Sequence, residues 1–334
     1  MITYDHKSGR IHPRDLGRVA SHYYITHRSM AVYQQDLRAD ASDIDILRVF
    51  SLSDEFRLIP VRAEERVELQ RLLERVPVPM RESADSPQAK INVLLQAYIA
   101  NLGLSGFALV SDMVYVTQSA GRIFRALFEL CLRRKWARAA HRVLNWCKQV
   151  ERRMWLTMTP LRQFAKLTDE KQTARALPKL IRSVERKPFP WSRYIDLSAQ
   201  ELGELLNDPT SGREMHKLVH QVPRLDISAH VQPLTRSLLR FELRITPDFR
   251  WKDRVHGAAE QFWIWVEDAD GEAILHSEMF VLKKLYVGQE HVTEFTCTLT
   301  EPLPPQYFVC VTSDRWIGSE TRLAVSFKYL SLPD

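Results

Sequence analysis

The sequence predicts an α+β multidomain chain, in which an all-α helical bundle and a helix-loop-helix unit precede an immunoglobulin- or fibronectin-III-like β-sandwich. Three observations support this class. The 334 residues are enough for two or three domains. Apolar residues recur every three or four positions from Arg14 to about Pro160, which is helical spacing. From Arg224 onward they alternate with polar residues, which is typical of half-buried strands.

The first residues predict a small β-hairpin. Residues 2–12 alternate apolar and polar side chains around a turn made by Lys7, Ser8, Gly9 and Arg10. Because two strands alone are only marginally stable in water, we expect residues 1–13 to be the end of a preceding domain.

Residues 14–168 predict the helical bundle. Ser42 and Ser53 stand where N-caps are expected, and Pro77 ends one predicted helix. Two further helices are predicted over residues 89–100 and 107–135. Residues 169–223 predict shorter helices interrupted by prolines, among them Pro178. Within this segment, helices over 199–206 and 214–222 joined by a turn at 207–212 would form the helix-loop-helix unit.

Residues 224–334 predict roughly seven short strands, as in a β-sandwich. Asp270 and Gly271 form a strong hairpin-turn pair between two of them. Cys297 and Cys310 lie on separate strands, where two buried thiols are favoured over a disulfide. The four cysteines contain no C-x-x-C pair, which argues against a zinc module.

Basic residues are concentrated in the middle of the chain. The net charge is +6, but the segment 122–193 holds 19 Lys and Arg against 5 Asp and Glu. This asymmetry indicates either a polyanionic or acidic partner or simply solvated helix faces.

The usual catalytic motifs are missing from the sequence. It contains no phosphate-binding Walker loop, G-x-G-x-x-G, G-x-S-x-G or H-E-x-x-H motif. His216 and His220 have the i, i+4 spacing of a metal pair, but no acidic or cysteine partner is nearby in sequence. We therefore expect no catalytic residue, cofactor or metal within these residues.

One predicted helix, residues 107–135, carries two distinct stripes. The apolar stripe runs from Met113 to Leu130, and the polar stripe consists of Gln118, Arg122, Arg125, Glu129 and Arg133. Guanidinium groups about 5–6 Å apart on such a stripe suit the phosphates of a single strand. Ser119 and Gly121 keep the surface beside Arg122 low. The alternative is an ordinary surface helix in which Arg125 pairs with Glu129.

Several separate runs resemble the Sec sixty-three-homology unit of Ski-two-like superfamily-two helicases. They occur in the family's order across the whole chain: residues 16–25 (LGRVASHYYI), 89–96 (AKINVLLQ), 160–164 (PLRQF), 231–236 (VQPLTR) and 313–316 (SDRW). Three further runs are closest to the spliceosomal branch of that family: residues 49–53 (VFSLS), 72–79 (LLERVPVP) and 115–122 (YVTQSAGR).

This resemblance implies a role for each part. Residues 1–13 would end a winged-helix domain, and residues 107–135 would be the ratchet helix, which touches single-stranded RNA through Ser119, Arg122 and Arg125. Gln118 and Arg133 of the same polar stripe join them as candidate RNA-binding residues. RecA-like domains elsewhere in the same helicase would bind ATP and Mg²⁺.

The resemblance also implies a setting and leaves alternatives. It implies the nucleus, unwinding of paired small nuclear RNAs, and docking of regulators such as the Jab/MPN domain of the splicing factor Prp-eight. One alternative is a protein-docking module with little RNA contact, as in the helicase of the activating signal cointegrator complex. Another, the endoplasmic-reticulum translocation protein that names the unit, is disfavoured because no apolar stretch approaches the ~20 residues of a membrane span.

Overall fold

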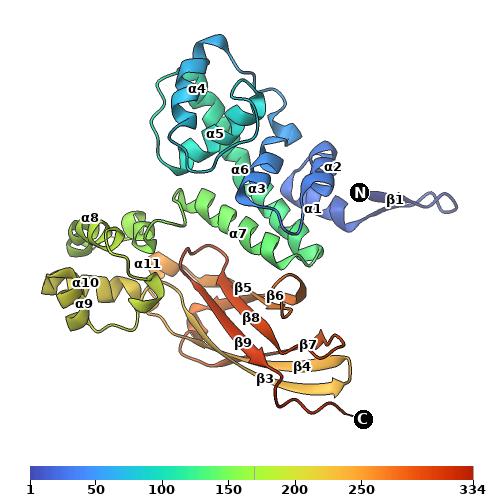
Figure 1. Ribbon diagram of the computed structural model, residues 1–334, viewed down its shortest axis with the longest axis vertical. Coiled ribbons are helices and arrows are strands. Elements are labelled where there is room, and N and C mark those ends of the chain that lie inside the picture. The colour runs from blue at the N-terminus through green and yellow to red at the C-terminus, as the bar shows by residue number, and fades with distance from the viewer. Residues whose placement is uncertain (169, 334) are drawn as a thin grey trace. The chain divides into compact units, whose positions relative to one another are not determined.

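The computed structural model describes residues 1–168 and 170–333, and it contains two compact units, Met1–Trp155 and Leu156–Asp334 (Figure 1). Helices fill the first unit, whereas the second combines short helices with two antiparallel sheets. The predicted α+β class is therefore confirmed. Within the described ranges, none of the helices combines the length and apolar character that crossing a membrane requires.

The first unit opens with a hairpin and continues as helices. In chain order its elements are β1 (Ile2–Tyr4), β2 (Ile11–Pro13), α1 (Asp15–Tyr23), α2 (His27–Asp36), α3 (Asp43–Ser51), η1 (Asp54–Phe56), η2 (Ala63–Glu65), α4 (Arg66–Leu73), α5 (Pro87–Ile99), α6 (Phe107–Arg133) and α7 (Ala137–Arg152). β1 and β2 pair antiparallel, with Gly9 in the turn at φ +68°.

Local sequence signals explain several helix ends. Ser42 caps α3 in a reciprocal capping box with Asp45, as predicted. Ser53 precedes η1, but its hydroxyl donates to the carbonyl of Phe50 (2.7 Å) instead of capping the next turn. Ser86 caps α5, where Pro87 occupies the first helical position.

Aromatic side chains hold the core of the first unit. Phe124 of α6 stacks between Phe50 of α3, at 4.8 Å between ring centroids, and Trp146 of α7, at 5.9 Å. All three are buried. Each such aromatic pair adds about 0.5–1.5 kcal/mol beyond the burial of its surface, so this stack fixes α6 against both neighbours.

The helical part of the second unit contains η3 (Pro160–Lys166), α8 (Lys171–Glu185), η4 (Trp191–Arg193), α9 (Ala199–Leu206) and α10 (Pro209–Val219). α9 has its predicted bounds and a capping box at Ser198. Two predictions are wrong here. Pro178 lies inside α8 on its exposed face, where water can solvate the carbonyl that loses its helical partner. α10 begins at Pro209, because proline suits the first turn of a helix and Asp208 caps it.

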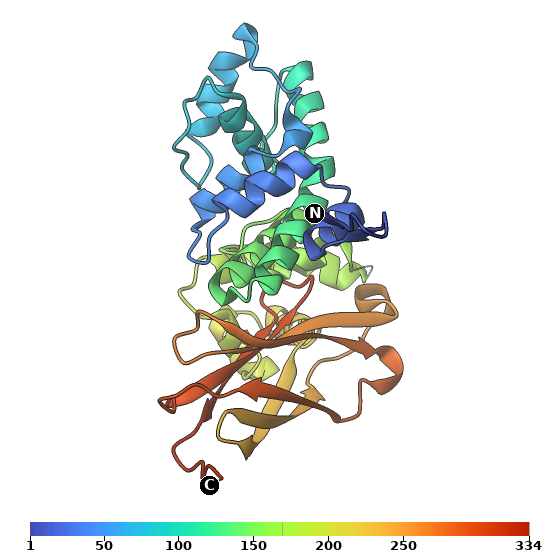
Figure 2. The ribbon, with the colours of Figure 1, turned by 90° about the vertical axis from the view of Figure 1, so that its right-hand side faces the viewer.

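The β-sandwich consists of seven strands in two sheets (Figures 1 and 2). The strands are β3 (Leu225–Thr235), β4 (Leu238–Pro247), β5 (Ala259–Glu267), β6 (Ile274–Lys283), β7 (His291–Thr298), β8 (Gln306–Ser313) and β9 (Glu320–Ser326). The sheet orders are β3-β4-β7 and β6-β5-β8-β9, and every pairing is antiparallel. α11 (Asp253–His256) precedes β5, and η5 (Lys284–Tyr286) follows β6. The predicted sandwich is therefore confirmed.

Two local predictions for the sandwich also hold. Gly271 has φ +67°, the left-handed conformation that the turn between β5 and β6 requires. Cys297 and Cys310 are buried free thiols, and burial raises the pKa of Cys297 to about 12.

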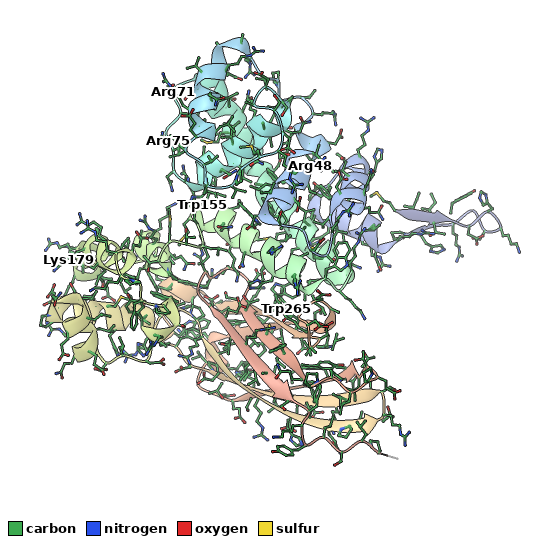
Figure 3. All side chains as sticks on the ribbon, in the orientation of Figure 1. Arg48, Arg71, Arg75, Trp155, Lys179 and Trp265 are labelled. Atoms are coloured by element: carbon green, nitrogen blue, oxygen red, sulfur yellow. The ribbon has the colours of Figure 1, made fainter. Side chains whose placement is uncertain are left out.

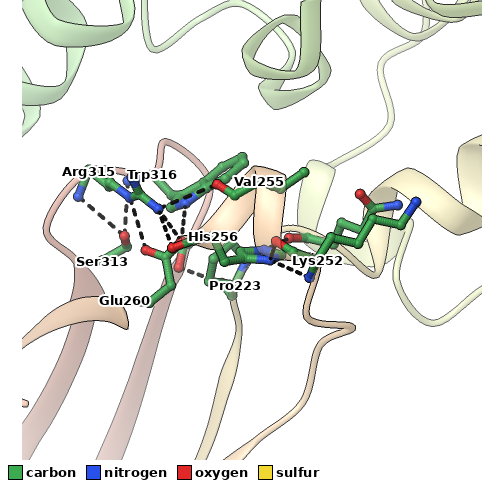
Figure 4. A network of polar contacts seen from close by, with 10 residues as sticks. Pro223, Lys252, Val255, His256, Glu260, Ser313, Arg315 and Trp316 are labelled. Atoms are coloured by element: carbon green, nitrogen blue, oxygen red, sulfur yellow. Dashed lines mark hydrogen bonds and ion pairs between the residues drawn. The ribbon is translucent and has the colours of Figure 1, made fainter. Parts of the chain in front are cut away.

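A polar network joins the turn between β8 and β9 to β5 and α11 (Figure 4). The carboxylate of Glu260 on β5, fully buried, accepts two hydrogen bonds from the guanidinium of Arg315, at 2.6 and 3.1 Å, and one from Trp316 at 3.0 Å. The hydroxyl of Ser313 accepts from the backbone N–H of Trp316 at 2.9 Å. Trp316 then packs on Phe164 of η3, with 5.5 Å between the rings.

Candidate nucleic-acid interface

α6 is the helix that carries the predicted RNA-binding residues. Its 27 residues make a rod about 40 Å long. The predicted apolar stripe is buried from Val116 to Leu130, whereas Met113 at its start is half-buried. The opposite face of the first turns is open to solvent, and Phe107 and Val114 are exposed there by 89% and 46%. One side of α6 is therefore anchored in the unit and the other remains accessible.

The two residues directly before α6 are bound by a side chain of another helix. Gly106, at the N-cap position, has no side chain to accept the free backbone N–H groups. The carboxylate of Glu68 on α4 accepts from the N–H of Ser105 at 2.7 Å and from that of Gly106 at 3.2 Å. A carboxylate is also favourable at the positive end of the helix dipole.

Arg122 is held in place by three acceptors. Its Nη1 donates to the backbone carbonyls of Tyr23, at 3.3 Å, and of Tyr24, which terminate α1. Its Nη2 donates to the hydroxyl of Ser119, one turn earlier on α6, at 3.1 Å. The sequence could not reveal the two carbonyl acceptors, because backbone groups of a distant segment leave no residue pattern.

These contacts leave one edge of the Arg122 guanidinium available. The group has five N–H donors, and the three contacts use both donors of Nη1 and one of Nη2. The remaining donors are the Nε–H and one N–H of Nη2, and guanidinium N–H groups of this kind bind phosphate. The neighbouring Gly121 is exposed, and beyond its own helix backbone and its chain neighbours a Cβ added there would meet no atom within 4 Å. The predicted low surface next to Arg122 is therefore present.

The other predicted arginines pair with carboxylates. Arg125 is half-buried and its Nη2 lies 3.5 Å from Glu151 of α7. Arg133 pairs with Glu129 at 2.7 Å and with Asp15 of α1 at 3.3 Å. Gln118 is exposed and Ser119 is buried. The structure thus brings Gln118, Ser119 and Arg122 together beside open surface, while Arg133 lies about three turns beyond Arg122 along the helix.

The remaining candidate from the sequence is the histidine pair. The rings of His216 and His220 lie 4.3 Å apart on α10, and Nδ1 of His220 is 2.8 Å from the carbonyl of His216. Throughout residues 1–168 and 170–333, no three His, Cys, Asp or Glu side chains are grouped so that they would hold a metal ion.

Fold and site together describe a helical bundle with a partly exposed cationic helix, joined in one chain to a β-sandwich. The family model for the Sec63 Brl domain matches residues 13–326, and the chain belongs to this family. The chain is 54% identical to the U5 small nuclear ribonucleoprotein 200 kDa helicase of Drosophila melanogaster, 53% identical to its human counterpart, and 52% identical to the pre-mRNA-splicing factor brr2 of Schizosaccharomyces pombe.

Each of these similarities covers the whole chain but only 15% of the relative. The resemblance drawn from the sequence runs is therefore confirmed at the level of the family and of its helicase relatives in splicing. The structure also explains two of those runs: residues 160–164 and 313–316 lie against each other. The Gln163 side chain bonds the backbone N–H and C=O of Ile317, at 3.0 and 2.9 Å.

Proposed function

We propose that this chain is a non-catalytic RNA-guiding and scaffolding module of a spliceosomal ATP-dependent RNA helicase, which works in the nucleus and unwinds paired small nuclear RNAs. In this proposal α6 is the ratchet helix and contacts one RNA strand through Ser119, Arg122 and Arg125, with Gln118 and Arg133 contributing. ATP and Mg²⁺ bind to RecA-like domains of the same helicase, which together with its winged-helix domain are the module's partners.

The observation that carries this proposal is the oriented guanidinium of Arg122. Three acceptors fix the group and leave two of its five N–H donors for a phosphate, and the neighbouring residue Gly121 is exposed. A preoriented arginine loses little conformational entropy when it binds a phosphate. Contacts of this kind do not read the base sequence, so binding should tolerate any sequence and weaken strongly with salt.

Two substitutions in the intact helicase test the proposal. R122Q/R125Q removes both charges, and two lost contacts at about 1.5 kcal/mol each predict roughly 100-fold weaker binding of single-stranded RNA. The slope of log K against log salt should also fall by about 1.4, because each lost phosphate contact removes about 0.7 on a single strand. The control is R71Q/R75Q, which removes the same charge from two exposed arginines, Arg71 near the end of α4 and Arg75 in the turn that follows it (Figure 3).

The second substitution, R122K, separates charge from geometry. Lysine keeps the positive charge but has no fork with which to bind phosphate bidentately. We expect R122K to lower RNA affinity while the salt slope stays unchanged. Normal RNA binding and unwinding by R122Q/R125Q would refute the RNA-guiding role.

A second candidate is a protein-docking module, either of the type found in the activating signal cointegrator complex helicase or one that binds the Prp-eight Jab/MPN domain. Exposed apolar side chains on the β6–β7 side of the sandwich favour it: Met279, Val281, Leu285 and Val292. Under this alternative, L285S would lower the affinity of the regulator for this chain and leave RNA binding intact. R122Q/R125Q would change neither the affinity for the regulator nor the affinity for RNA.

A further inference from the structure

A lysine is completely buried in the first unit. Lys90 lies on α5, and its side chain has 0% exposure. Its ammonium group donates to the carbonyl of Pro60 at 2.7 Å, to Glu65 of η2 at 2.6 Å and to Asp112 of α6 at 2.7 Å. All three donors of the ammonium group therefore have an acceptor, as a buried charge requires.

A second cation completes the group. Nη1 of Arg62 bonds Glu65 and, at 2.8 Å, Asp112. We call these four residues, Arg62, Glu65, Lys90 and Asp112, the Lys90 cluster; it contains two positive and two negative charges. Burial disfavours ionisation of both carboxylates, yet hydrogen bonds from Lys90 and Arg62 outweigh it and lower the pKa of Glu65 and of Asp112.

The Lys90 cluster connects α6 to segments that precede it by 20 to 50 residues. Asp112 is its only member on α6, and it lies in the second turn of the helix. Its Oδ2 atom receives bonds from both Lys90 and Arg62. The Glu68 carboxylate binds the backbone N–H groups of Ser105 and Gly106, directly before α6. Directional polar contacts therefore hold both the entry to α6 and its second turn.

Such contacts constrain a helix differently from apolar packing. Apolar surfaces tolerate small rotations and shifts, because dispersion contacts are non-directional. A buried ion pair tolerates neither, since a displaced partner leaves a charge unpaired in a medium of low dielectric constant. Buried ionic groups often add little to net stability, and in some proteins they specify one arrangement.

We propose that Lys90 is a positioning residue, which fixes the rotation and height of α6 so that Arg122 presents its open edge to RNA. Asp112 precedes Arg122 by ten residues, about 15 Å along the helix axis. The ion pair between Lys90 and Asp112 and the carbonyl contacts of Arg122 thus fix α6 at two separate points. This inference rests on the RNA-guiding role proposed above.

The test replaces the charges of the Lys90 cluster without leaving a buried one unpaired. In E65Q/K90M/D112N the amides keep the shapes of the carboxylates, and Arg62 is partly solvated because a third of its side chain is exposed. D54N/R57Q is the matched control, since it neutralises an ion pair of 2.9 Å whose arginine is 57% exposed. Both are made in the intact helicase, and melting, amide hydrogen exchange and affinity for a single-stranded oligonucleotide are measured.

We expect the triple variant to melt within a few degrees of the parent, to exchange amides in the first turns of α6 about tenfold faster, and to bind RNA about tenfold more weakly. Added to R122Q/R125Q, it should weaken binding less than twofold further, because the cluster acts through those arginines. Unchanged affinity in a stably folded triple variant would overturn the inference, as would a fully additive effect. The control should match the parent in all three measurements.

Two further arms keep the test decisive. Should the triple variant unfold, D112N alone applies the same criteria, with about threefold weaker binding expected and unchanged binding overturning the inference. Should R122Q/R125Q itself bind RNA normally, the RNA-guiding role fails. The positioning role of Lys90 is then tested by the amide exchange rates of α6 in the triple variant alone. A tenfold increase supports this role, and no increase refutes it.

Discussion

Replacing Arg315 by alanine tests what holds the turn between β8 and β9 on the sandwich. The parent guanidinium donates twice to Glu260 and once to the carbonyl of His256, at 3.1 Å. Glu260 itself is completely inaccessible to water. Figure 4 shows two side chains that donate to the carboxylate of Glu260, those of Arg315 and Trp316. In R315A only the indole N–H of Trp316 remains of these two.

The expected loss follows from that burial. Removing one partner of a buried, hydrogen-bonded ion pair typically costs about 3–5 kcal/mol, because the other charge stays buried. Replacing both partners, as in E260L/R315M, leaves no buried charge and should recover most of the loss. An exposed ion pair should behave differently, so R240A, which breaks the pair with Glu294, should leave stability within error.

Amide hydrogen exchange measures this loss in the sandwich alone, which matters because a chain of two units need not unfold in one step. A loss of about 3–5 kcal/mol predicts exchange in β5 and β8 faster by about 10²- to 10⁴-fold, if those amides exchange through opening of the sandwich. An increase below tenfold in R315A would refute the reasoning, and so would a double variant as unstable as the single one.

Three further substitutions and conditions have definite expected outcomes. G212A should destabilise the pair α9–α10 by about 1–3 kcal/mol, because its Cβ would lie 2.4 Å from the backbone of Gly203. Hydrogen exchange measures this loss, and the control is G288A, whose Cβ would have none of the tested atoms within 4 Å. G121A should raise the melting temperature, since alanine favours a helix interior by about 1 kcal/mol over glycine. It should weaken RNA binding, because the added methyl group raises the low surface beside Arg122 that RNA would approach. Hydrogen bonds from two lysines lower the pKa of Glu170 to about 2, so its contribution to stability, present above about pH 4.5, is lost as the pH falls toward 2. In acid titrations followed by circular dichroism, E170Q should therefore lose less stability than the parent between pH 5 and pH 2.

Periodicity and caps were sufficient to predict most of the fold. The capping signal at Ser42 acts within four residues, so the sequence alone reveals it. The turn at Gly271 is equally local. Pro178 misled the prediction because the cost of a proline in a helix depends on whether the carbonyl left without a partner reaches water, which only the folded structure shows.

The candidate site was predictable in part. Helical spacing placed Arg122 on the polar stripe with Ser119 beside it, and the structure joins the two by a hydrogen bond of 3.1 Å. The carbonyls at the end of α1 and the buried ammonium group of Lys90 were not predictable. Lys90 lies in a run of buried residues on α5, where nothing in the local pattern distinguishes a lysine with three acceptors from one on a solvated face.

Under the proposed RNA-guiding role, Arg122 would bind a phosphate although it already has intramolecular partners. The carbonyls at the end of α1 carry the partial negative charge of a helix C-terminus, and a cation there stabilises that helix. A phosphate need not compete with them, because it approaches the other edge of the same planar group. In that proposal, the intramolecular contacts would lower the cost of phosphate binding, because they fix the guanidinium before RNA binds. A lysine held by the same contacts would have no second pair of N–H donors for a phosphate. At this position the geometry of arginine therefore matters as much as its charge.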